Sequence, residues 1–259
     1  MERKSPLQFS TEQFFLDIAG ITRFSGRFFK TLFITRFEGN EFLRQCFRVG
    51  VQSLLLIGVT AVILGLVLTI QIRPIVAGLG AESWMPSLVF ISVVTELGPV
   101  MFSLIFAGKV GSSIGAELSS MRVTEQIDAM EVSGTNLFNF LVVSRVSATT
   151  LMLPLLVFIG DFLAFMGSFI GLKAYSNISF QLFYSRAFSE FYFRDITPAT
   201  IKTLFFGFSI GIISCYMGYY SGRGTEGVGK AANAAVVASS LVVFLLDLIA
   251  VQLADLILY

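Results

Sequence analysis

The amino-acid sequence predicts an all-α integral membrane protein, and three observations lead to this class. The mean hydropathy of the 259 residues is +0.80, and only 14% of them are charged, whereas about a quarter are charged in ordinary soluble domains. The apolar residues are also concentrated in runs. Residues 49–70 form a run of 22 without a charge, and residues 203–222 form one of 20. About 20 apolar residues in a helix cross the bilayer core.

The N-terminal region, residues 1–46, is predicted to be cytoplasmic and interfacial rather than membrane-spanning. In residues 7–36, apolar side chains such as Phe14, Ile18 and Ile21 recur at helical spacing, with basic residues among them. This pattern is typical of an amphipathic helix that lies in the membrane interface. A helix packed on a cytosolic surface has a similar pattern, so both interpretations stay open.

The remaining residues, 47–259, are predicted to form one five-span membrane domain. The candidate spans lie at about residues 47–70, 83–108, 141–171, 200–220 and 232–257. Basic residues are enriched in cytoplasmic segments of membrane proteins. With the N-terminus inside, 13 of the 18 basic residues are cytoplasmic, and the segment at residues 172–202 holds four of the other five. The sequence therefore predicts a cytoplasmic N-terminus and, after five spans, an external C-terminus.

Several classes of function find no support in the composition. The net charge of +1 gives no indication of a nucleic-acid partner, and the chain contains no histidine, the commonest metal ligand. Its two cysteines, Cys46 and Cys215, lie far apart in the sequence. Neither a metal site nor a disulfide framework is therefore predicted.

The stretch GRGTEGVGKAA at residues 222–232 places Gly224, Gly229 and Lys230 at the spacing of a Walker A phosphate loop. Such a loop follows a β-strand and carries Ser or Thr after the lysine to hold Mg²⁺. Here Ala231 follows the lysine, and the preceding residues belong to a predicted span. The sequence therefore predicts a glycine-containing turn between the fourth and fifth spans, and no ATP site on this chain.

Glu96 lies inside the second predicted span and is followed closely by Gly98 and Pro99. Proline has no N–H group, and its ring clashes with the carbonyl four residues earlier. Backbone polar groups are thus exposed beside a carboxylate, which a membrane tolerates only against protein or a wet cavity. Glu96 is therefore a candidate cavity residue. The alternative is a kinked helix in which Glu96 pairs with a neighbour.

The segment after Lys109 is polar and helix-forming, with Glu117, Arg122, Glu125 and Asp128 among its residues. Its predicted cytoplasmic position indicates a helix that lies across the membrane face, where a soluble partner can bind. An ordinary solvated loop helix fits the same residues.

Two stretches resemble the MlaE-type (YrbE-type) permease family, the membrane subunits of ABC transporters that move lipids through MCE-protein systems. The first joins ELGPV to AGKVGSSIGAELSSMRVTEQIDAMEV, and the second is GYYSGRGTEGVGKAANAAVVASSLVVFLLD. The resemblance covers about residues 44–259. The chain departs from the family pattern at Lys109, where arginine is usual, and in the lack of paired threonines after the glycine loop.

The resemblance implies a homodimer in the bacterial inner membrane, with an N-terminal interfacial helix and a lipid cavity at the dimer axis. A separate cytoplasmic ABC ATPase would bind ATP, so no cofactor is expected on this chain. A periplasmic MCE-domain protein and, as an optional component, a small STAS-like accessory subunit complete the implied partners. The implied cargo is a membrane lipid, with phospholipid as the leading class.

The residues singled out fall into three groups, none catalytic and none a metal ligand. The lipid-cavity candidates are Glu96, Gly98, Pro99, Lys202 and Asp247. The ATPase-coupling candidates, within residues 116–131, are Glu117, Met121, Arg122, Thr124, Glu125, Gln126 and Asp128. The glycine-loop candidates are Gly224, Gly227 and Gly229.

Two other functions are compatible with the intramembrane acids. A stand-alone ion-coupled transporter or channel would use Glu96, Asp161 and Asp247, because such acids commonly mark ion pathways. An intramembrane enzyme would use Asp161 and Asp247 as an aspartyl pair. The first alternative leaves the polar segment after Lys109 unexplained, and no other catalytic motif accompanies the second.

Overall fold

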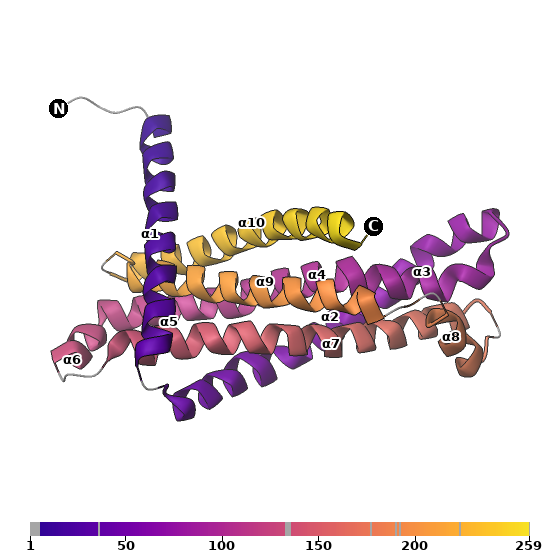
Figure 1. The fold of residues 1–259 in the computed structure, drawn as a ribbon, viewed down its shortest axis with the longest axis horizontal. Helices are drawn as coiled ribbons and strands as arrows, with labels where there is room; N and C mark the ends of the chain where they lie inside the picture. The colour runs from indigo at the N-terminus through magenta and orange to yellow at the C-terminus, as the bar shows by residue number, and fades with distance from the viewer. Residues whose placement is uncertain are drawn as a thin grey trace.

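The computed structural model describes residues 6–35, 37–132, 136–176, 178–189, 191, 193–222 and 224–258. Within these ranges the chain is almost entirely helical and contains no β-strand. Five helical units are long and apolar enough to span a membrane. They form one elongated bundle (Figure 1). The predicted fold class is confirmed.

The five units extend beyond the predicted spans, because the helices continue past their apolar runs. The units are α2 (Gly39–Gly78), a composite unit at Glu82–Val123, the unit Phe138–Lys173 that contains η4 (Phe138–Val143) and α7 (Ser144–Lys173), α9 (Phe193–Tyr219) and α10 (Thr225–Leu258). The 40 residues of α2 correspond to about 60 Å of helix. This helix is about twice as long as the hydrocarbon core is thick, so part of it protrudes from the apolar layer.

The composite unit consists of helical segments joined by two wide π-helical turns. Its parts are η1 (Glu82–Trp84), α3 (Met85–Ser92), η2 (Val93–Leu97), α4 (Gly98–Phe106), η3 (Ala107–Gly111) and α5 (Ser112–Val123). In the first wide turn, the N–H of Gly98 bonds to the carbonyl oxygen of Val93, five residues earlier. This turn absorbs the interruption that Pro99 causes, because a proline neither donates nor fits against the preceding turn.

The polar segment between the second and third units is not one continuous helix. The second unit ends with α5, the chain turns at Thr124 and Glu125, and α6 (Gln126–Val132) follows. Glu125 has a φ of +57°, the left-handed conformation that commonly ends helices. The region predicted as a helix across the membrane face is therefore a helix end, a turn and a short helix.

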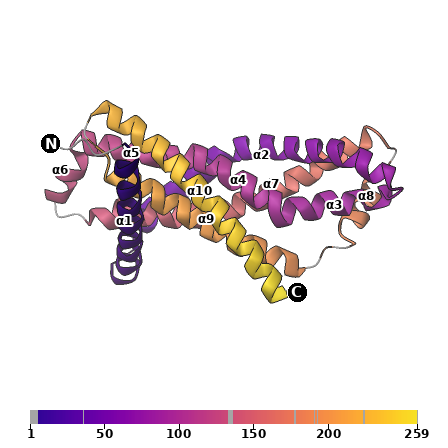
Figure 2. The ribbon, with the colours of Figure 1, turned by 90° about the horizontal axis from the view of Figure 1, so that it is seen from above.

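The N-terminal helix α1 (Pro6–Ile34) lies across the bundle, at the end that carries α5 and α6 (Figures 1 and 2). Its buried residues, Phe24 and Phe28, pack on the bundle, and the Phe24 ring lies 5.0 Å from that of Phe138. On its free side, Phe33 is 82% exposed. The helix predicted over residues 7–36 corresponds to α1, which ends at Ile34, and Arg36 lies outside the described residues; the placement of this helix in the membrane interface stays a prediction.

The opposite end of the bundle carries a short helix, α8 (Phe180–Ala187). Phe183 of this helix is buried, and its ring lies 4.9 Å from that of Phe165 on α7. The loop between the third and fourth spans is thus held against the bundle by aromatic contacts.

The helices α2 and α7 approach each other most closely. A Cβ atom at Gly65 would collide with the carbonyl oxygen of Ala164, and one at Gly167 would collide with that of Val62. Glycines on the facing sides let the two backbones meet, which is a common way to pack helices in membranes.

By contrast, α10 is the least enclosed span. In its most apolar window only 17% of residues are buried, against 56% for the units of α7 and α9. Its C-terminal half diverges from the bundle (Figure 2), and Leu241, Leu245 and Leu248 are among its exposed residues. A single chain therefore leaves an apolar face of α10 uncovered.

The α2–α7 contact yields a stability prediction. We expect Gly167→Ala to lower the free energy of unfolding by about 1–3 kcal/mol, because overpacking forces the two backbones apart. Gly229→Ala is the matched control, since a Cβ there meets nothing within 4 Å and alanine favours a helix interior. Thermal unfolding in detergent measures both. Equal melting temperatures for the two variants would contradict the close contact.

Candidate functional site

Three of the predicted cavity residues meet around one ammonium group. The Nζ atom of Lys202, on α9, lies 2.5 Å from Oε2 of Glu96 on η2 and 3.0 Å from Oδ1 of Asp247 on α10. This contact joins the second, fourth and fifth spans. We call these three residues the Lys202 cluster. The sequence leaves two interpretations of Glu96 open, a cavity residue or a partner in an ion pair, and the structure contains the ion pair.

Burial differs strongly among the three side chains of the Lys202 cluster. The side chain of Lys202 is 5% exposed, that of Asp247 is 19% exposed and that of Glu96 is 43% exposed. A buried ammonium group needs a charged partner, because its desolvation is otherwise too costly. Two carboxylates around one ammonium leave one negative charge in excess. Glu96 is the more accessible of the two acids and can still interact with a polar group.

Lys202 also changes the analysis of orientation. The sequence analysis counts it with the external segment at residues 172–202, but the structure places it inside α9, where it is buried. It is an intramembrane cation and not a loop residue. Fewer basic residues therefore lie in the predicted external segments, which increases the predicted charge asymmetry.

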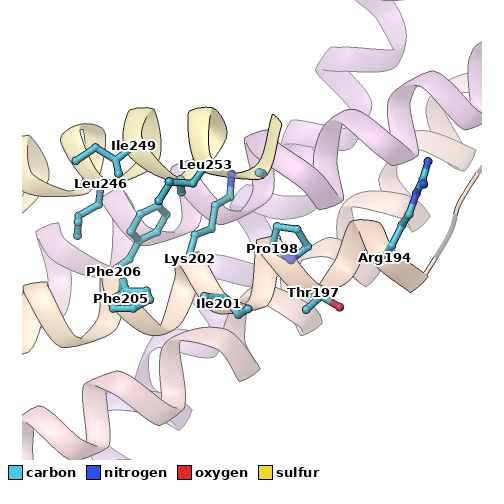
Figure 3. A pocket seen from close by; sticks show the side chains of 12 residues that line it. Arg194, Thr197, Pro198, Ile201, Lys202, Phe205, Phe206, Leu246, Ile249 and Leu253 are labelled. Atoms are coloured by element: carbon cyan, nitrogen blue, oxygen red, sulfur yellow. The ribbon is translucent and has the colours of Figure 1, made fainter. Parts of the chain in front are cut away.

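An apolar cavity of about 630 Å³ lies between α9 and α10, next to the Lys202 cluster (Figure 3). Figure 3 shows Lys202 reaching from α9 toward α10 along its wall. The lining residues are Arg194, Thr197, Pro198, Ile201, Lys202, Phe205, Phe206, Leu246, Ile249, Ala250, Leu253 and Ala254. Sites for small molecules have volumes of about 300–1,000 Å³, with apolar walls and few polar groups. The cavity can therefore hold a largely apolar molecule with a polar end.

Of the five predicted cavity residues, Lys202 lines this cavity, whereas Glu96, Gly98, Pro99 and Asp247 do not. Gly98 and Pro99 are buried, and a Cβ atom at Gly98 would collide with Oδ1 of Asp161 on α7. Gly98 thus gives space to the carboxyl group of Asp161, which is 7% exposed and whose Oδ1 has no hydrogen-bond partner. Asp247 bonds instead to Lys202. Within the described residues, no hydrogen bond joins the two acids that were considered as an aspartyl pair.

Some of the predicted coupling residues face the bundle, and the others lie at the exposed turn between α5 and α6. Glu117 and Met121 turn toward the bundle, where Met121 packs on the hydrophobic core. Arg122 and Asp128 form an ion pair of 2.9 Å across the turn. The exposed tip consists of Thr124, Glu125 and Gln126. Of the seven predicted coupling residues, those of this tip and its flanking ion pair are the most accessible to a partner.

The Glu117 contacts are a feature that the sequence analysis missed. Oε1 of Glu117 lies 2.7 Å from Nη1 of Arg48 on α2 and 3.1 Å from Nη2 of Arg145 at the start of α7. In the sequence, Arg48 and Arg145 each precede a long apolar stretch, and Glu117 follows one. These positions were visible in the sequence, although the pairing was not.

Of the three predicted glycine-loop residues, only Gly224 lies in the turn, whereas Gly227 and Gly229 belong to the first turns of α10, which begins earlier than the sequence predicts. The fourth span ends at Tyr219, Gly224 has a φ of +94°, and α10 begins at Thr225. Gly227 contacts the carbonyl of Gly222, where a side chain would not fit, while Gly229 lies in α10 with open space beside it. Lys230 is exposed and pairs with Glu226. In the described part of this segment, a helix and not a strand precedes the glycines, so the architecture of a phosphate loop is not present there.

Comparisons with known proteins agree with this architecture. The sequence model of the family described as Permease MlaE matches residues 42–253. The chain belongs to the MlaE permease family. A protein of Rickettsia prowazekii named "Probable ABC transporter permease protein RP096" is 38% identical over 211 residues, 82% of each chain. The similarly named slr1045 of Synechocystis is 33% identical over 221 residues, 85% of this chain and 84% of its own.

As an MlaE permease, the chain is a multi-pass membrane protein and a membrane component of an ABC transporter. Membership of this class implies a separate ATPase partner. The matched region, residues 42–253, includes all five membrane-spanning units for most of their length. It therefore contains both the Lys202 cluster and the turn at Glu125.

The Lys202 cluster yields a second stability prediction. We expect Lys202→Met to lower the free energy of unfolding by about 3 kcal/mol, because two carboxylates then share a site without a counter-charge. The additional changes Glu96→Gln and Asp247→Asn should restore most of this loss. Lys230→Met, which removes an exposed ion pair, should cost less than about 1 kcal/mol. Thermal unfolding in detergent measures each variant. A triple variant as unstable as Lys202→Met would contradict the electrostatic explanation.

Proposed function

We propose that this permease is a subunit of an ABC-type lipid transporter in the bacterial inner membrane, with phospholipid as its cargo. The observation that carries the proposal is the apolar cavity beside the Lys202 cluster. Its walls suit acyl chains, while Lys202 and the partly exposed Glu96 suit the polar headgroup. A phospholipid combines both chemistries in one molecule.

The uncovered face of α10 supports the homodimer in this proposal. The cavity lies at the edge of the single chain, between α9 and α10, and the outward residues of α10 are apolar and exposed. A second copy packed on α10 would cover this face and enclose the cavity near the dimer axis. The family resemblance implies the same arrangement.

The proposed topology has a cytoplasmic N-terminus and a periplasmic C-terminus. The end of the bundle with α5 and α6 then faces the cytoplasm, where the ATPase subunit docks on the tip at Thr124, Glu125 and Gln126. On the opposite side, a periplasmic MCE-domain protein would connect the cavity to the outer envelope. A small STAS-like accessory subunit stays an optional part of this assembly.

A mechanism follows from the contacts of Glu117. Closure of the ATPase dimer on ATP would push on the turn at Glu125, which continues into α5. Glu117 of α5 bonds to Arg48 of α2 and to Arg145 beside α7. The push would therefore reach two helices that pack closely together, while the loosely packed α10 changes its position. This relative movement would alter the access of a lipid to the cavity.

The proposed cargo is tested by purification of the permease with its operon partners, followed by mass spectrometry of the bound lipids. We expect phospholipid, an ABC ATPase and an MCE protein to co-purify. Ala250→Trp, which fills part of the cavity, should reduce the bound phospholipid several-fold. Leu155→Trp is the control, because Leu155 is exposed on α7 and lines none of the cavities described here. Equal lipid content in both variants would contradict the cavity assignment.

The same purification distinguishes the ion-coupled alternative. A chain that purifies alone and without lipid, and that conducts ions in vesicles without an ATPase, would overturn the lipid-permease proposal. The intramembrane acids would then have to be re-examined as an ion pathway.

The proposed docking tip generates a further prediction. We expect Glu125→Lys to lower ATP-driven lipid transport about tenfold or more, which corresponds to the loss of one important interface contact. The melting temperature should stay close to that of the wild type, because Glu125 is exposed. Glu82→Lys makes the same charge reversal at the opposite end of the bundle and should leave coupling intact. Normal transport by Glu125→Lys would exclude this docking face.

A further inference from the structure

A second cavity, which is polar, lies near the end of the bundle that carries α5 and α6 and is separate from the Lys202 cluster. It has a volume of about 120 Å³ and lies between α2 and the segment η3–α5. Lys109, Ser113 and Glu117 line it from one face of η3–α5, four residues apart. From α2 it is lined by polar residues that include Arg48 and Ser53.

The position of this cavity is set by the limits of the apolar stretches. Arg48 is the last charged residue before the long uncharged run of α2, and Lys109 is the first charged residue after Glu96. The phosphate groups of a bilayer lie at the same level, just outside the hydrocarbon core. The cavity is therefore within reach of lipid headgroups.

Positive charges outnumber negative charges among the residues that line this cavity. Glu117 is the only acid that lines it, and its Oε1 atom already accepts from both Arg48 and Arg145. Lys109 makes no ion pair with any residue that the structure describes. Two guanidinium groups thus bond to this one carboxylate, and Lys109 lines the same cavity without an acidic partner among the described residues.

Ser53 gives an independent indication of a ligand. Its side chain is 1% exposed and lines the cavity, and its hydroxyl oxygen has no hydrogen-bond partner. A buried hydroxyl without a partner is destabilising, and such groups are normally satisfied by protein, water or ligand. An acceptor inside the cavity would receive this hydrogen bond.

We propose that this cavity binds a phosphate group, supplied by the headgroup of a membrane lipid. Ammonium, guanidinium and hydroxyl groups are together the donors that phosphate oxygens prefer. The volume is about four times the roughly 30 Å³ share of one water molecule, which admits a headgroup but no acyl chains. Basic pockets between membrane helices bind lipid headgroups in this manner. The bound phosphate would tie α2 to α5, the helix that leads to the turn at Glu125.

This site does not depend on the identity of the transported molecule. It lies in a different cavity from the one between α9 and α10, and it shares no lining residue with that cavity. A lipid bound here would be a structural partner of the permease and not its cargo.

The test uses native mass spectrometry of the full-length chain in detergent, titrated with dioleoyl phosphatidylglycerol. Dioleoylglycerol, with the same chains and no phosphate, and inorganic phosphate are the comparison ligands. We expect Lys109→Gln to weaken phosphatidylglycerol binding about tenfold, as the loss of a charge-assisted hydrogen bond predicts, and Lys109→Arg to retain it. Ser53→Ala should weaken binding a few-fold. Dioleoylglycerol binding should be equal in all variants.

Lys230→Gln is the matched control, because it removes an exposed lysine from the first turns of α10, which begins at the same end of the bundle (Figure 1). Equal phosphatidylglycerol binding by Lys109→Gln and Lys230→Gln would overturn the proposal. Binding of inorganic phosphate that Lys109→Gln abolishes, without any effect on phosphatidylglycerol, would assign the site to free phosphate and overturn its lipid origin. If Lys109→Gln does not fold, Ser53→Ala and Lys109→Arg give the same comparison.

Discussion

The position of α10 against the rest of this permease depends on one buried ammonium group, that of Lys202. Lys202 has little contact with solvent, so its charge is stable only while Glu96 and Asp247 remain beside it. These acids belong to two other spans. The contact therefore fixes the position of α10 along the bundle axis relative to α9 and to the π-helical turn of the second span. The apolar cavity lies directly beside this contact, because Lys202 is one of its lining residues. A molecule in the cavity therefore lies beside a charge whose position is set by three helices at once.

The two halves of the bundle are held together by different forces. Between α2 and α7, glycines allow backbone-to-backbone packing, which resists sliding because interiors are packed at crystal-like density. Between α9 and the C-terminal half of α10, by contrast, lie an ion-pair cluster and a cavity. The first half is suited to transmit a displacement as a unit, and the second is suited to change shape. The Glu117 contacts connect the turn at Glu125 to the first half.

The sequence predicted the spans well, because apolar runs of membrane length have few alternative structures. It predicted the helix ends poorly, since helices such as α2 continue past their uncharged runs at both ends. The sequence indicates the residues of the Lys202 cluster but not their mutual contact, because positions 96, 202 and 247 are brought together only by the packing of three helices. The contact of Gly98 with Asp161 could not be predicted either, because it also depends on the packing of separate helices. The left-handed conformation of Glu125 had no signal either, because glycine or asparagine usually occupies such a position.

The contact between Gly98 and Asp161 also constrains how this family can diversify. The carboxyl group of Asp161 fills the space that a side chain at position 98 would need. A larger residue at position 98 is therefore compatible only with a smaller residue, or a displaced helix, at position 161. The two positions are expected to change together during evolution, whereas the exposed positions of α7 are free to drift alone. Contact in the fold thus couples the substitutions of two residues that lie 63 positions apart in the sequence.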